Sequence, residues 1–124
     1  MVNYSYTNWT GVIVSKIMVG QMVEVHLLNG KRFLGKIRIK DEQGLTVYCI
    51  PVKALESVPP GSGAKAEMRE MMHTLFFPWQ QIEYVDIGGE PVGFDSLYYS
   101  WFHGESIDDF FEKSTLSERE RTEV

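Results

Sequence analysis

The Asn29-Gly30 pair, which lies between two segments of alternating polarity, constrains the fold of this chain most strongly. Val23, Val25 and Leu27 alternate with polar residues before the pair, and residues 32–40 alternate after it. Alternation with a period of two is typical of a half-buried strand, and Asn-Gly is the strongest short signal for a hairpin turn. These residues therefore predict a β-hairpin within a mainly β domain.

The second strand of this hairpin contains Gly35 at its centre. A glycine inside a strand indicates a sharp bend or a close backbone approach. Phe33, Ile37 and Ile39 are expected to share one face of the strand with Gly35. Three further short apolar segments, residues 45–50, 74–77 and 82–87, predict a total of five strands.

The segments outside these strands divide the chain into three regions. Residues 1–16 are expected to form an N-terminal arm or short helix, and residues 17–89 form the β domain. Residues 51–73 interrupt the strands as a long excursion, in which residues 64–72 favour a helical turn. Residues 90–124 form an aromatic, acidic C-terminal extension. Within it, Ser106 is a candidate N-cap for a helix over residues 106–113, and the final ten residues are expected to be disordered.

Composition limits the class of protein. The 124 residues fit one domain, and 44% of them are hydrophobic, which is enough for a core. One cysteine and the lack of a membrane-length apolar run favour an intracellular, cytoplasmic protein without a membrane partner. The net charge is −5, but residues 104–124 carry −4 of it. The β domain is therefore almost neutral.

One motif spans the predicted hairpin. A hydrophobic residue and a glycine precede the alternating strand, and a phenylalanine, a glycine and an aspartate follow the turn; the residues are Ile17, Gly20, Val23, Val25, Leu27, Asn29, Gly30, Phe33, Gly35, Ile37 and Asp41. In this order and spacing they resemble the first motif of the Sm/LSm family. The resemblance implies a small, strongly bent, five-stranded Sm-like barrel, here with a C-terminal helical extension.

The second motif of that family is only partly present. Pro78-Trp79 stands where the family has Arg-Gly, Leu45 stands at the position of the family's asparagine, and Gln43 at that of its stacking residue. The resemblance implies a homo-oligomeric ring of about five to seven subunits, in which strand four of one copy pairs with strand five of the next. The residues expected at this interface are Leu75, Phe76, Phe77, Ile82, Tyr84 and Val85.

Single-stranded RNA or DNA is the partner that the resemblance implies. Lys36, Arg38 and Lys40 alternate on one strand, where they predict either a phosphate-binding belt or an ordinary solvated face. Asp41 and Gln43 fall in the first RNA-contacting loop of the family, although their residue types favour a plain turn.

Trp79 and Gln80 fall in the second loop. Trp79 is expected either to stack on a base or to pack at a subunit interface.

No residue pattern indicates an enzyme, a cofactor or a metal site. The three histidines and Cys49 are scattered, and no pair of them has metal-ligand spacing. Two functional hypotheses remain. The first is a ring-forming Sm-like protein that binds single-stranded RNA, or DNA, in nucleic-acid processing. The second is a homo-oligomeric assembly or protein-interaction module that has the same fold and has lost the RNA pocket.

Overall fold

The computed structural model describes the backbone of residues 17–61, 63–88, 94–95, 98, 102 and 105–122, with side chains up to Ser114. The expected N-terminal arm lies outside these residues, as does most of the segment 89–104. No helix within the described residues is both long enough and apolar enough to cross a bilayer.

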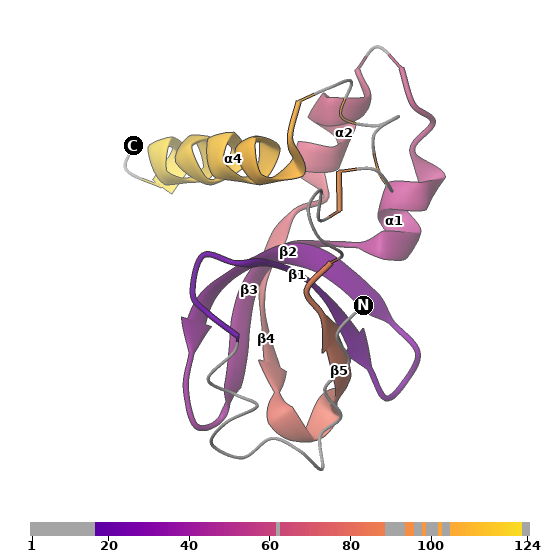
Figure 1. Ribbon diagram of the computed structural model, residues 1–124. Helices are drawn as coiled ribbons and strands as arrows, with labels where there is room; N and C mark the ends of the chain where they lie inside the picture. Colours follow the sequence, from indigo (N-terminus) through magenta and orange to yellow (C-terminus); the bar gives the residue numbers. More distant parts are fainter. Residues whose placement is uncertain are drawn as a thin grey trace.

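Five antiparallel strands form one sheet (Figure 1), and they are β1 (Met22–Leu27), β2 (Arg32–Lys40), β3 (Gly44–Pro51), β4 (His73–Pro78) and β5 (Ile82–Asp86). Their order across the sheet is β4-β3-β2-β1-β5. The predicted mainly β class is confirmed, together with the hairpin and the C-terminal helix. The sheet is open: β4 and β5 are its two edges, and no pairing between them closes it within the described residues.

Gly35 lies where β2 and β3 approach each other most closely. It is opposite Cys49 in the β2–β3 register, and a Cβ atom at Gly35 would lie 2.2 Å from the carbonyl oxygen of Tyr48. No side chain fits in that space. The close backbone approach that the sequence indicated is therefore confirmed.

The alternation of β2 fails at its end. A register shift between Ile37 and Ile39 marks an irregularity in the β2–β3 ladder, and Ile39 is 52% exposed. An extra residue in a strand turns the side chains that follow it to the other face. The expectation that Ile39 shares the buried face of Ile37 is therefore wrong.

Among the described residues, the helical segments that connect or cover the strands are α1 (Val52–Ser57), α2 (Ala64–Glu70), the single turn η3 (Trp79–Gln81) and α4 (Ile107–Thr122). The excursion contains the expected helix, α2, and also α1, which no sequence signal indicated. The Ser106 hydroxyl accepts the Asp109 amide at 3.0 Å, which confirms the N-cap. α4 continues to Thr122, so the expected disorder is wrong for that stretch, where glutamate and arginine favour a helix.

Buried apolar side chains form two clusters on opposite faces of the curved sheet. The inner cluster lies within the curve and consists of Ile17, Val23, Val25, Leu27, Ile37, Leu45, Val47, Cys49, Phe77, Trp79, Ile82 and Val85. The outer cluster lies between the sheet and the helices above it in Figure 1, and it consists of Leu34, Tyr48, Ile50, Val52, Leu55, Val58, Ala64, Met68, Met72, Phe94, Tyr98, Phe102, Ile107, Phe110 and Phe111. The sheet is thus covered on both faces.

Candidate nucleic-acid interface

The two predicted nucleic-acid loops meet in the structure. The Trp79 indole donates its Nε1 hydrogen to the carbonyl of Asp41 at 2.9 Å, and the Trp79 amide donates to the carbonyl of Gln43 at 3.1 Å. The Asp41 carboxylate accepts the amides of Gln43 and Gly44 at 2.8 and 3.1 Å. These contacts fix the β2–β3 turn against η3, although the two segments are far apart in the sequence.

The side chains of these loops differ in what they offer to a ligand. The Trp79 ring is only 7% exposed and belongs to the inner cluster, so it would have to leave the core to stack on a base. Gln43 and Gln80 are exposed, and Asp41 uses its carboxylate within the turn. Gln43 and Gln80 therefore offer exposed amides, next to the exposed side chains of Glu42 and Gln81.

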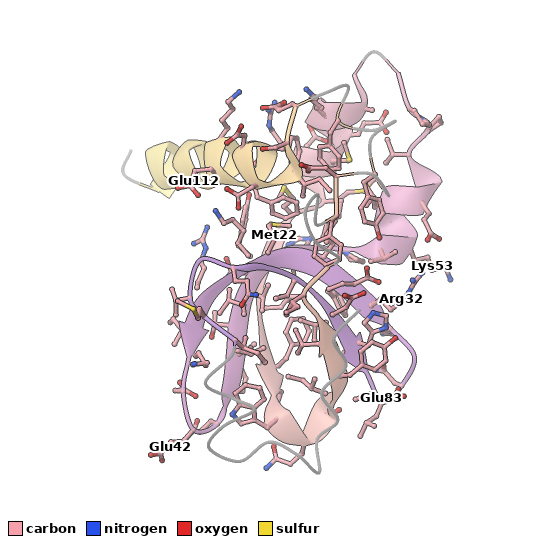
Figure 2. All side chains as sticks on the ribbon, in the orientation of Figure 1. Met22, Arg32, Glu42, Lys53, Glu83 and Glu112 are labelled. Atoms are coloured by element: carbon pink, nitrogen blue, oxygen red, sulfur yellow. The ribbon has the colours of Figure 1, made fainter. Side chains whose placement is uncertain are left out.

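Lys36 is paired with the C-terminal helix. Its Nζ donates to Glu112 Oε2 at 2.9 Å and lies 3.1 Å from Asp108 Oδ1, and both acids are on α4. Figure 2 labels Glu112 on this helix, above the sheet. Burial alone would lower the pKa of Lys36, but the hydrogen bonds to Glu112 and Asp108 outweigh it and raise that pKa. A phosphate would have to compete with two carboxylates for this ammonium group.

The other two predicted basic residues also have contacts within the chain. The Arg38 guanidinium lies 4.5 Å from the centre of the Tyr48 ring, at a distance typical of a cation–π contact. Lys40 Nζ donates to the carbonyl of Ile17 at 2.6 Å. Each of the three predicted RNA-binding bases, Lys36, Arg38 and Lys40, is therefore engaged within the chain.

The residues expected at an oligomer interface fall into two groups. Phe77, Ile82 and Val85 are in the inner cluster, with at most 5% exposure. Phe76 is 49% exposed on the edge strand β4, whereas Leu75 and Tyr84 are half-buried. Phe76 and Leu75 line an apolar hollow of about 320 Å³ together with Leu27, Phe77, Pro78 and Gln81. Of the six residues, only Phe77, Ile82 and Val85 are fully buried in the core of one chain.

A basic groove, which sequence reasoning missed, lies between the β1–β2 turn and the start of α1. Its volume is about 690 Å³, and it is lined by Asn29, Gly30, Lys31, Arg32, Phe33, Pro51, Lys53 and Glu56. Three of these residues are basic and one is acidic. Figure 2 shows Arg32 and Lys53 on the same side of the molecule. The signal in the sequence was the Lys31-Arg32 pair, but Lys53 joins it only through the fold.

A buried polar cluster lies next to this groove on the β1–β5 pair. Glu24 and Asp86 face each other across the two strands and are 4% and 6% exposed, and His26 follows Glu24 on the same face of β1. Ligand atoms of these three side chains lie within 4.8 Å of one another. Among the described residues, this is the group whose donor atoms are placed to hold a metal ion.

The charges of this cluster are unevenly compensated. Arg32 NH1 lies 3.3 Å from Glu24 Oε1, and the Tyr98 hydroxyl donates to Glu24 Oε2 at 3.4 Å. Burial raises the pKa of Glu24, and burial together with Arg32 lowers the pKa of His26. Of the two buried carboxylates, Glu24 is the one that a guanidinium contacts.

Comparisons with known proteins give no relative from which a role could be transferred. No protein-family model matches the chain, and neither the curated proteins nor the solved structures provide a significant match. The geometry described above is therefore the basis for a functional assignment.

Proposed function

We propose that this chain is an Sm-like protein that assembles through its two sheet edges into a closed homo-oligomeric ring and binds single-stranded RNA. The observation that carries the proposal is the strand order, which leaves β4 and β5 with one strand neighbour each in the described part of the chain. An exposed edge strand is a template for pairing with another chain, and a rotationally closed ring removes all such edges.

Further features of the edges support assembly. Phe76 exposes a large apolar side chain on β4, next to the apolar hollow. β4 is paired over its length with β3, so its opposite side is the one available to a neighbouring copy. The curvature of the sheet and the close approach at Gly35 agree with the bent barrel that the resemblance implies, and pairing with a second copy would complete it.

RNA binding is assigned mainly to the basic groove rather than to Lys36, Arg38 and Lys40. Lys31, Arg32 and Lys53 supply positive charge to the groove, and Phe33 supplies an aromatic wall. A charged groove with an aromatic surface is the usual way in which proteins bind single strands without a fixed sequence. In a ring, each subunit would contribute one such groove, and the exposed amides of Gln43 and Gln80 would offer contacts to base edges.

Fluorescence anisotropy with labelled oligo-U, oligo-A and single-stranded DNA tests this function. We expect the intact ring to bind RNA with a dissociation constant below about 100 µM, the weak end of non-specific binding. Replacing both Lys31 and Lys53 by alanine should weaken binding and reduce the salt slope by about one for each phosphate that the groove no longer neutralises. The matched control replaces both lysines by arginine and keeps the charge. Binding that is unchanged in the alanine variant would contradict the assignment to the groove.

A second function is favoured by the burial of Trp79 and the pairing of Lys36 with α4. Trp79 and Lys36, which the family resemblance would assign to RNA, are thus occupied within the chain. This supports an assembly or protein-interaction module that forms the ring but has lost the RNA pocket. A ring that binds no oligonucleotide at low salt, and that retains a protein partner in a pulldown, would favour this alternative.

A further inference from the structure

His26 holds a ring nitrogen that the described residues leave without a hydrogen bond. Its Nε2 is buried, and it lies 3.2 Å from Glu24 Oε1 in a direction that does not allow a hydrogen bond between them. Buried polar atoms are almost always satisfied, because leaving one unpaired costs about 1–3 kcal/mol. In the tautomer that leaves Nε2 unprotonated, its lone pair and the carboxylate oxygen repel each other unless a cation lies between them.

The remaining ligand atoms converge on the same point. Asp86 is the cross-strand partner of Glu24, and its carboxylate completes a group of three donor atoms within 4.8 Å. We propose that Glu24, His26 and Asp86 bind a divalent transition-metal ion, with Zn²⁺ as the best fit, between β1 and β5.

Distances within the cluster are compatible with such an ion. Ligands placed tetrahedrally at about 2.1 Å from zinc lie about 3.4 Å from one another. The Nε2–Oε1 separation of 3.2 Å already matches this value. The widest separation in the group needs a contraction of roughly 1 Å, which rotation of the carboxylate side chains supplies. Three protein ligands leave the fourth position for a water molecule.

The donor set also selects the class of ion. One imidazole and two carboxylates suit zinc and related first-row ions, whereas magnesium and calcium prefer oxygen alone. Arg32 contacts Glu24, so a dication would compensate the charge of Asp86, the second buried carboxylate.

The surroundings of His26 and Asp86 hold these ligands in place. The Tyr84 ring stacks on His26 with 4.0 Å between centroids, and Asp86 Oδ1 accepts the Gly88 amide at 2.8 Å. Contacts of this kind orient metal ligands in proteins.

Arg32 competes with the ion for Glu24, because its NH1 contacts Glu24 Oε1. The Arg32 side chain is 43% exposed, and its second contact is with Glu56 at 3.3 Å, so it can turn toward Glu56 when the ion binds.

Zinc titration of the metal-stripped full chain, in competition with a chromophoric chelator, tests the site. We expect one Zn²⁺ per chain, and more than a 10-fold loss of affinity in Asp86→Asn and in His26→Gln. The matched control is His73→Gln, which changes an exposed histidine on β4 and should leave the affinity unchanged. Circular dichroism establishes that each variant is folded. No zinc bound by the wild-type chain at roughly 100 µM, or equal affinity in His26→Gln, would overturn the proposal.

A second measurement needs no variant. Nuclear magnetic resonance of the wild-type chain should show zinc-dependent shifts of the His26 imidazole nitrogens and none for His73. Shifts at His73 alone, or at neither residue, would refute the site even if the variants fail to fold. None of the three ligands lines the groove assigned to RNA, so zinc binding can be measured without RNA; Arg32 is the residue that the groove and the site have in common.

Discussion

The inner and outer faces of the sheet are both buried, but they are buried in different ways. The inner cluster is drawn almost entirely from strand residues and consists of apolar side chains. The outer face combines an apolar cluster with buried or paired charges: Glu24 and Asp86 near one edge, and Lys36 under α4. The burial of residues on the inner face thus follows from the alternation within each strand. The burial of residues on the outer face depends on contacts between segments that are distant in the sequence.

The largest expected effect comes from Gly35, where the backbones of β2 and β3 leave no room for a side chain. Gly35→Ala places a Cβ atom 2.2 Å from the Tyr48 carbonyl oxygen, which the backbone cannot accommodate without separating β2 from β3. We expect a loss of about 4 kcal/mol or more in the free energy of unfolding, measured by urea denaturation. The control is Ile39→Ala on the same strand, where exposure should limit the change to about 0.5 kcal/mol.

Trp79→Ala tests whether the inner face is one cooperative unit. The change removes a buried indole and its hydrogen bond to Asp41, so we expect a loss of about 3–5 kcal/mol. Trp79→Phe retains a ring in the core and should lose much less. Amide hydrogen exchange should show that all five strands lose protection together in the alanine variant. Protection that is lost only in β4 would contradict a cooperative inner face.

Phe111→Ala makes the corresponding change on the outer face. Phe111 is fully buried and packs edge-on against Tyr48, so its truncation should weaken the docking of α4 by about 3 kcal/mol. The sheet should nevertheless keep its hydrogen-exchange protection, because the inner cluster is intact. Equal loss of protection in α4 and in the strands would show that the two faces are not separable.

Neutralising two acids of α4 tests whether their contacts with Lys36 keep this residue from binding RNA. In the double variant Asp108→Asn, Glu112→Gln, Lys36 loses both carboxylate partners, and we expect RNA affinity to rise severalfold at low salt. Stability should change by less than about 1 kcal/mol, because both acids are exposed. Asp109→Asn removes one negative charge from α4 without touching Lys36, and it should raise affinity less. Asp109→Asn removes one charge and the double variant two, so an effect of Asp109→Asn that is half as large on a logarithmic scale would mean that only overall charge matters.

The smallest effect concerns the pH dependence of the outer face. The hydrogen bonds from Lys113 and Lys65 to Glu105 lower the pKa of that carboxyl below 4.5. The folded state therefore releases the proton more readily than the unfolded state, and the stabilisation is lost as the pH falls below 4.5 through the folded pKa. Thermal denaturation of wild type and Glu105→Gln should give melting temperatures that converge in acid. A difference in melting temperature that stays the same as the pH falls would contradict this prediction.

The sequence-based predictions were accurate where neighbouring residues determine the structure, and less accurate where contacts between distant segments determine it. The hairpin at Asn29-Gly30, the approach at Gly35 and the Ser106 cap depend on neighbouring residues, and all three are confirmed. α1 was missed because it is one short segment with no capping side chain. The exposure of Ile39 depends on an irregularity in the ladder that alternation does not reveal.

The candidate sites were harder to predict because their residues come from separate elements. Asp86 meets Glu24 only through the β1–β5 register, and Lys53 joins the basic groove only when α1 follows β3. Lys36 looked like a solvated base because its partners are on α4, in another part of the sequence. Trp79 looked like a loop residue, but it is buried because η3 turns it into the inner cluster.

The central claim is that the free edges β4 and β5 pair between copies of the chain. Light scattering coupled to size-exclusion chromatography of the full chain tests it most directly. We expect a single species with the mass of about five to seven chains, since a closed ring leaves no edge unpaired. A species with the mass of one chain, unchanged across protein concentrations, would contradict the account.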